Sequence, residues 1–419
     1  MMLSSAPLAE QQALPSAETI QQLQEAFSFV RHEREDVRKM AIHGIAANSK
    51  DNRDLWLFLA SAQYGPSCAD SLLQYMHAGG KHVLGDILTI LVNCSADGSC
   101  SEMLVQRKVV RKAMRLLDGM ERSDQPESFV RSVQELTLML LNNLTASHVT
   151  AIDDLLQKED EDMRGFYLGK LQVHYEHFFR ASEAERANRA NSAEEAGEDA
   201  MKKLKSAPGD TDEDSMRSTQ AASTAASPRD LSLWILQILL NLTRTLDGQE
   251  LLLEDDEWRE TLNNSLLSPN PRHRYLAAQC YRNCGCSPKP FYSLILKSDA
   301  LVTAVERLNC TEPVEDIQRS LAEFIASMLE SEDGIARLES VNAKKLLLRA
   351  LDISKAAHAA RAAAASSRVE VMEEDESPVA ATPAVTLAPS VCELLERSVL
   401  PYLDDITDAY IAPGSDELD

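Results

Sequence analysis

One short phrase recurs along the chain and constrains its fold more than any other feature. In each copy an apolar, helix-like run is followed by Asn, then a small or apolar residue, then Ser or Thr. The clearest copies are Ile90–Ser95, Leu140–Thr145 and Ile238–Thr243. Weaker copies end at Asn48 and Ser49, run through Arg282–Cys284, or carry Ser327 where the Asn would stand. A recurring phrase of this kind indicates repeated structural units rather than one irregular domain.

The spacing of the copies identifies the kind of repeat. From Asn48 through Asn93, Asn143, Asn241 and Asn283 to Ser327, the steps are 45, 50, 98, 42 and 44 residues. All but the third are close to the roughly 40–47 residues of armadillo or HEAT units. Such repeats bury their apolar faces by stacking on one another, which gives a curved surface. The sequence therefore predicts an all-α, armadillo/HEAT-like, right-handed superhelical solenoid of about six repeats.

The long third step requires an insertion, and composition locates it. Residues 181–229 are rich in Ala, Glu, Ser and Asp, and residues 354–389 combine an Ala run with acidic residues and Pro. Such segments have too little apolar surface to offset the entropy lost on ordering, and the alternative for Ala181–Lys205 is a transient helix. The predicted order is a flexible N-terminus (1–17), N-terminal repeats (18–180), a disordered insertion (181–229), C-terminal repeats (230–353), a disordered linker (354–389), a capping helix (390–410) and a flexible tail (411–419).

Charge and hydropathy exclude several classes of partner. The formal net charge of −24 repels phosphate backbones, so we expect no nucleic-acid ligand. No run reaches the roughly 18–20 apolar residues that span a bilayer, and the N-terminus lacks a signal-peptide pattern. We therefore expect no membrane association. The 8 cysteines, scattered through a long chain, are typical of a reducing compartment. A cytoplasmic protein is predicted.

The candidate metal ligands do not form a complete site. Cys280, Cys284 and Cys286 with the nearby His273 offer at best one Cys-x3-Cys pair, whereas a structural zinc site needs four ligands. His174 and His177 lack the His-Glu-x-x-His spacing. No phosphate-binding loop or nucleophile elbow is present. We predict no metal, no cofactor and no catalytic residue, and hence a protein that is not an enzyme.

The phrase that ends each apolar run resembles the third helix of an armadillo repeat. In that family these helices line a groove, and in peptide-binding members the Asn contacts the backbone of an extended ligand. The resemblance implies a protein-binding groove that contains the four Asn residues, the residues one turn before three of them, and one tryptophan: Asn93, Asn143, Asn241, Asn283, Thr89, Gln237, Gln279 and Trp234. The alternative is that each Asn only satisfies backbone groups at the end of its helix.

The order of the copies carries a closer resemblance. The succession Leu91–Gly98, Leu141–Thr145, Leu239–Thr243 with Glu250–Asp256, Tyr281–Cys286 and Asp316–Glu323 is similar to the eukaryotic Hgh family. That family is an armadillo-type chaperone adaptor that assists folding of translation elongation factor two together with the cytosolic chaperonin and Hsp-ninety. The resemblance implies that this chain binds the same client and the same chaperones as partners.

The chain also departs from the family pattern. The family carries an acidic, proline-rich loop before its sixth repeat, and only Asn309–Val314 occupies that place here. The two segments predicted to be disordered are also additional. The alternative function is an armadillo scaffold or transport receptor that binds linear basic peptides. Such receptors carry a regular Trp one turn before each Asn, and this chain has only Trp234 near Asn241.

Overall fold

A computed structural model describes residues 14–77, 82–206, 229–286, 295–368 and 385–403, with the backbone alone described at 189–206 and 364–368. The chain divides into two compact units, Met1–Ile235 and Leu236–Asp419. The described residues of both units form helices and turns, without a strand. The predictions for 1–13, 207–228, 369–384 and 404–419 fall outside the described residues.

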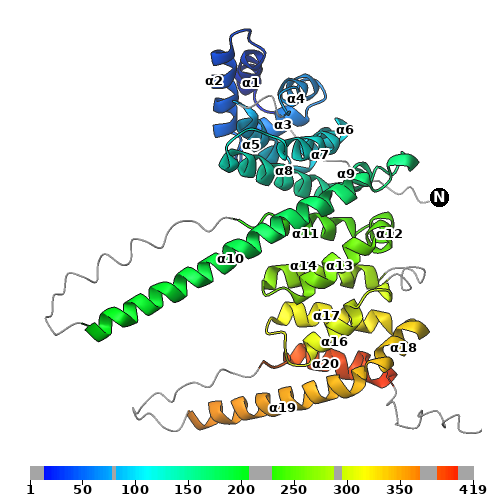
Figure 1. Ribbon diagram of the computed structural model, residues 1–419. Coiled ribbons are helices and arrows are strands. Elements are labelled where there is room, and N and C mark those ends of the chain that lie inside the picture. Colours follow the sequence, from blue (N-terminus) through cyan, green and yellow to red (C-terminus); the bar gives the residue numbers. More distant parts are fainter. Residues whose placement is uncertain (1–13, 78–81, 207–228, 287–294, 369–384, 404–419) are drawn as a thin grey trace, which may run out of the picture. The chain divides into compact units, whose positions relative to one another are not determined.

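The first unit is a stack of short helices. They are α1 (Ala17–Val30), α2 (Glu35–Ala47), α3 (Arg53–Ala60), α4 (Gly65–Leu73), α5 (Leu84–Cys94), α6 (Gly98–Gln106), α7 (Val109–Met120), α8 (Glu127–Ser147), α9 (Val149–Leu156), the 3-10 helix η1 (Glu161–Met163) and α10 (Phe166–Ser206). Helices α2, α5 and α8 pack side by side in that order, and α3 packs beside α6 (Figure 1). Helix α11 (Ser232–Leu242) contains the boundary between the units.

The second unit repeats this arrangement. Its helices are α12 (Leu246–Glu254), α13 (Asp256–Leu267), α14 (Pro271–Gly285), α16 (Ala300–Leu308), α17 (Glu315–Met328), α18 (Glu332–Ser340), α19 (Ala343–Arg368), α20 (Pro389–Ser398) and the 3-10 helix η4 (Leu400–Tyr402). Helices α14, α17 and α20 pack in one row, and α13, α16 and α19 pack in another. Each row buries one apolar stripe of every helix against its neighbours, as solenoid repeats require.

The turn after the repeated phrase is built by local capping. Four residues after Asn48, Asn93, Asn241 and Ser327, a short polar side chain accepts a hydrogen bond from a backbone N–H at the start of the next helix. The capping residues are Asn52, Asp97, Thr245 and Ser331. Such caps satisfy donors that the first helical turn leaves without partners. These four copies of the phrase therefore also specify where the following helix begins, whereas α9, which follows the copy with Asn143, begins after His148 without a side-chain cap.

The short segment Asn309–Val314 contains a buried ion pair, which we call the ionic clasp. Glu312 lies between α16 and α17 with its carboxylate fully buried, and it accepts two hydrogen bonds from the guanidinium of Arg274 on α14, at 2.7 and 3.0 Å. The same carboxylate accepts a hydrogen bond from the backbone N–H of Val314 at 3.1 Å. The Glu312 carbonyl accepts one from the amide of Gln318 at 2.6 Å. This clasp ties the segment to α14 and α17.

Two helices are longer than the sequence analysis expects. Helix α10 continues to Ser206, past the predicted start of the disordered insertion at residue 181, and α19 continues to Arg368, past the predicted start of the linker at 354. Both extensions are rich in Ala together with Glu, Lys or Arg, which have high intrinsic helix propensity. The predicted capping helix 390–410 corresponds to α20 and η4, followed by residues outside the described part.

Candidate protein-binding faces

In the first unit, the repeated Asn residues link neighbouring helices. The amide Nδ2 of Asn93 on α5 donates to Ser49 Oγ, after α2, at 2.8 Å. The amide Nδ2 of Asn143 on α8 donates to Ser95 Oγ, after α5, at 3.0 Å. The Asn of one repeat is therefore bonded to the hydroxyl that ends the phrase of the preceding repeat.

The same link occurs in the second unit. Asn283 Nδ2 on α14 donates to Thr243 Oγ1, after α11, at 3.0 Å. Thr243 Oγ1 in turn donates to the carbonyl of Leu240 at 2.7 Å, as Ser49 and Ser95 donate to carbonyls of their own helices. Because the single hydroxyl hydrogen is used in this way, each hydroxyl offers its lone pairs to the Asn. We call this series of links the Asn ladder.

The sixth copy replaces the ladder bond with a close contact. On α17, Ser327 occupies the position of the ladder Asn. In the preceding copy, the position of the hydroxyl that would accept the hydrogen bond is occupied by Gly285. A Cβ atom at residue 285 would lie 2.2 Å from Ser327 Oγ and 3.2 Å from Phe324 Cδ2. On α17 the shorter Ser327 takes the place of Asn, and on α14 Gly285 takes the place of Ser or Thr. These two changes let α14 and α17 approach closely at this point.

Each ladder Asn uses only half of its amide group in these links. The side chains of Asn93, Asn143 and Asn283 are half-buried. Their carbonyl oxygens accept no hydrogen bond from the described residues, and none of them is buried without a partner. An amide carbonyl is a good acceptor for a backbone N–H of another chain. The ladder residues can therefore hold the repeats together and contact a ligand at the same time.

The other predicted groove residues are divided between the units. Thr89, on α5 in the first unit, is half-buried and donates to the Gly85 carbonyl of its own helix at 2.8 Å. Trp234, also in the first unit, is half-buried on α11. In the second unit, Gln237 is half-buried on the same helix and Asn241 is buried. The structure therefore groups Thr89 with Asn93 and Asn143, and groups Gln237 with Asn241, Gln279 and Asn283.

Gln279 belongs to a row of polar side chains that the sequence analysis missed. Its amide donates to Ser320 Oγ on α17 at 2.7 Å. One turn further along the same pair of helices, Arg282 and Glu323 form a salt bridge. On α14 the row continues to Tyr275, which is 38% exposed. Residues 275, 279 and 282 have the helical spacing of one face, so this periodicity is the signal that would have identified them.

The row extends from α17 to α20. Arg319 Nη2 lies 3.2 Å from Glu315 Oε1 on its own helix, and Ser390 Oγ on α20 donates to the same Glu315 oxygen at 2.9 Å. Positive and negative side chains alternate along this face. The face of α14, α17 and α20 is therefore polar and of mixed charge.

The corresponding region of the first unit is more apolar. Met40 on α2 is 76% exposed and Phe29 on α1 is 41% exposed, and both line a shallow groove between these helices with Leu23 and Gly44. Beside the groove, His43 on α2 lies 3.3 Å from Asp86 on α5. Methionine adapts its shape to different partners, and exposed apolar side chains that lie together favour protein contacts.

Within the cysteine and histidine clusters, Cys280, Cys284 and His174 are buried, whereas Cys286 and His177 are exposed. Cys280 and Cys284 are fully buried, and burial raises the pKa of both thiols, that of Cys284 to about 12. A metal needs the thiolate, which this environment disfavours. His174 is buried beside Glu121, with Nδ1 at 3.1 Å from the carboxylate, and burial lowers its pKa. Among the described residues, no three His, Cys, Asp or Glu side chains are placed to hold a metal ion.

None of the described helices combines the length and the apolar character needed to cross a bilayer.

Comparisons with known proteins support the fold. No family model matches the chain, and no curated protein matches it in sequence. An engineered protein of known crystal structure is similar with a TM-score of 0.53 and 13% identity, over 78% of this chain and 63% of that one. This chain therefore spans less than two thirds of that protein. A designed armadillo repeat protein in complex with the peptide (KR)4 has a TM-score of 0.49 and 11% identity, over 72% and 98% of the two chains.

The described helices of each unit stack in rows, and the ladder links successive repeats. These features and the similarity to the engineered protein confirm the predicted class. The chain is an all-α, armadillo/HEAT-like solenoid.

Proposed function

We propose that this chain is a non-catalytic scaffold that binds another protein along the faces of its Asn-bearing helices. The observation that carries the proposal is the divided use of each ladder amide. The nitrogen of Asn93, Asn143 and Asn283 bonds to the preceding repeat, whereas the carbonyl oxygen accepts no hydrogen bond from the described residues. Such carbonyls, two in the first unit and one in the second, suit the backbone N–H groups of an extended polypeptide.

In each unit, side chains near the ladder Asn residues offer further contacts to a bound protein. In the second unit, Tyr275, Gln279 and Arg282 lie along one face of the helix that carries Asn283. Tyrosine and arginine are enriched where interfaces gain most of their binding energy. In the first unit, the exposed side chains of Met40 and Phe29 offer apolar contacts. These features support a client with both apolar and charged surface.

The proposed client follows from the resemblance to the Hgh family. We propose translation elongation factor two as the client, with the cytosolic chaperonin and Hsp-ninety as cooperating partners in the cytoplasm. The order of the repeated motifs along the sequence supports this choice. The mixed charge of the face of α14, α17 and α20 also suits the surface of a folding domain better than a uniformly basic peptide.

The second candidate function is binding of linear basic peptides. It is favoured by the net charge of −24 and by the carboxylates of Asp86 and Glu135 on α5 and α8 of the first unit. Opposite charges steer association and fix the register of a ligand. Against it, Arg282 and Arg319 stand on the face of the second unit and would repel such a peptide.

The two candidates predict different ligands. We expect the intact protein to bind purified elongation factor two in an affinity measurement such as calorimetry at physiological salt. We expect a Lys/Arg-rich octapeptide to bind at least tenfold more weakly, because its affinity depends on a few screened charge pairs. Tight binding of the peptide with no binding of elongation factor two would select the second candidate.

The contribution of the ladder carbonyls can be separated from their structural role. Replacing Asn93 and Asn143 together with alanine should weaken client binding about tenfold, because each hydrogen bond contributes about 0.5–1.5 kcal/mol. The matched control replaces Ser49 and Ser95 with alanine. This pair breaks the same links between helices and leaves both Asn carbonyls in place.

The Ser variant should lower the thermal midpoint at least as much as the Asn variant, because it loses the same two links and also the hydroxyl hydrogen bonds to the carbonyls of Ala46 and Val92. Only the Asn variant should lose affinity for the client, measured at a temperature where both variants are folded. An equal loss of affinity in both variants would show that the Asn residues act only as structural links. An unchanged affinity in both would exclude these helices of the first unit from the binding site.

A further inference from the structure

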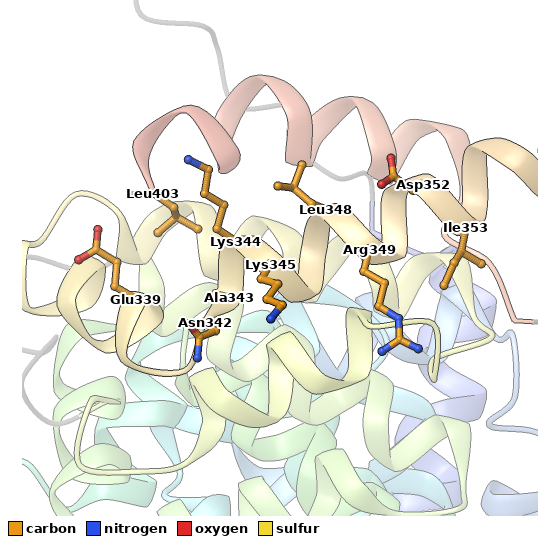
Figure 2. A pocket seen from close by; sticks show the side chains of 10 residues that line it. All are labelled: Glu339, Asn342, Ala343, Lys344, Lys345, Leu348, Arg349, Asp352, Ile353 and Leu403. Atoms are coloured by element: carbon orange, nitrogen blue, oxygen red, sulfur yellow. The ribbon is translucent and has the colours of Figure 1, made fainter. Parts of the chain in front are cut away.

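A groove at the last described repeat of the second unit has no role in the proposed client site. It has a volume of about 470 Å³ and is lined chiefly by α19, with Leu403 at its edge. Figure 2 shows two adjacent stripes of α19 along it. Lys345, Arg349 and Ile353 form one stripe, and Lys344, Leu348 and Asp352 form the other.

The position of the groove in the stack explains why apolar side chains are exposed there. Helix α16 packs against α19 from the preceding repeat, and α18, α20 and η4 also contact α19. Repeats of a solenoid cover their apolar faces with the next repeat, and the face of the last one needs another cover. Leu348 and Ile353 on this face are each 39% exposed. The groove is therefore the place where a further chain segment would pack.

The charges of the groove indicate the chemistry of that segment. Lys345 and Arg349 are one helical turn apart and exposed, and neither forms a salt bridge with a described residue. The carboxylates that also line the groove are those of Glu339 and Asp352. In a chain with a net charge of −24, a pair of cations beside exposed apolar side chains favours an acidic segment that also carries apolar residues.

Such a segment follows the groove directly in the sequence. Residues 404–419 carry six carboxylate side chains and no Lys or Arg, and they include four large apolar residues: Asp404, Asp405, Asp408, Asp416, Glu417 and Asp419, with Ile406, Tyr410, Ile411 and Leu418. The preceding residue, Leu403, lines the groove. From Asn342 to Ile353 the groove extends roughly 16 Å along the helix. An extended segment of this length spans up to about 50 Å, so it can reach every part.

We propose that residues 404–419 dock in this groove. Their carboxylates pair with Lys345 and Arg349, and their apolar side chains cover Leu348 and Ile353. Because the segment is joined to the edge of the groove, its effective concentration there is high and weak individual contacts suffice. The docked segment caps the last repeat and shields it from acidic segments of other proteins.

The docking can be tested in the full-length protein with a carbodiimide, which joins a carboxylate directly to a lysine amine when the two are in contact. Peptide mapping by mass spectrometry should find links within one chain between Lys345 and Asp404, Asp405 or Asp408. Arg349→Glu should lower the yield of these links about fivefold, because it replaces an attractive pair by a repulsive one. Leu348→Ser should also lower it, because it removes apolar contact.

Arg361→Glu is the matched control, since Arg361 is exposed on the same helix outside the groove. It should leave the yield unchanged. All three substituted side chains are exposed, so the variants should keep the thermal midpoint of the parent protein. The proposal is overturned if Lys345 links only to the acidic residues Glu373–Glu376, only to a second copy of the chain, or to no carboxylate at all. It is equally overturned if Arg349→Glu and Arg361→Glu behave alike.

Discussion

Replacing Glu312 with alanine should lower the free energy of unfolding by roughly 3–5 kcal/mol. The carboxylate of Glu312 is fully buried and is bonded through both oxygens to the guanidinium of Arg274, which is also buried. Without Glu312, the Arg274 charge would stay inside the protein with only the carbonyls of Ser268 and Pro269 as partners. An unpaired buried charge is far more costly than the pair itself contributes. Urea denaturation followed by circular dichroism measures the change.

A surface glutamate provides the matched control. Glu315 is close in sequence and pairs with Arg319 one turn away at 3.2 Å, but both side chains are about half exposed. Glu315→Gln should therefore change the free energy of unfolding by less than about 0.5 kcal/mol. Replacing Glu312 and Arg274 together with Gln and Met should recover part of the loss, because the buried Arg274 charge is removed while Arg307, 3.8 Å from Glu312, still loses its carboxylate. A loss below about 1 kcal/mol in Glu312→Ala would contradict the buried clasp.

We expect Gly248→Ala to destabilise the protein by about 3 kcal/mol, although alanine is the better helix former. Gly248 lies in the first turn of α12, where its backbone N–H donates to the capping hydroxyl of Thr245 at 3.2 Å. A Cβ atom there would lie 2.2 Å from the backbone carbonyl oxygen of Leu242 and 2.8 Å from its carbon. Because the obstacle is backbone, a side-chain rotation cannot relieve the clash. Gly334 at the start of α18 has the same relation to Met328 and should respond in the same way.

Gly44→Ala serves as the control, because this substitution should stabilise the protein rather than destabilise it. This residue is exposed on α2, and a Cβ atom there would meet nothing within 4 Å. Gly44→Ala should therefore raise the free energy of unfolding by about 0.5–1 kcal/mol, because alanine restricts the unfolded chain and favours helix. Thermal melting of the two variants gives the comparison. If Gly248→Ala also stabilised the protein, α12 and the end of α11 would have to be further apart than in this structure.

The sequence by itself determined the class of the fold and the residues at which several helices begin. The repeated phrase, its spacing and the absence of strand-like alternation predicted a helical solenoid, and each unit has that architecture. The caps at Asn52, Asp97, Thr245 and Ser331 follow the phrase at a constant distance. These features are accessible from sequence because they depend on residues a few positions apart, through helical periodicity and hydrogen bonds within one turn.

Only the tertiary structure decided how these elements are joined. The phrase marked Asn93 and Asn143, but their bonds to Ser49 and Ser95 are made across 44 and 48 residues. Glu312 meets Arg274 across 38 residues, and no local pattern distinguishes it from the many exposed glutamates of this acidic chain. Capping and periodicity act along one helix, whereas a partner on another helix is chosen by the stacking of repeats. Packing between helices thus decides which half of each ladder amide is used within the protein, and the sequence of one helix does not encode it.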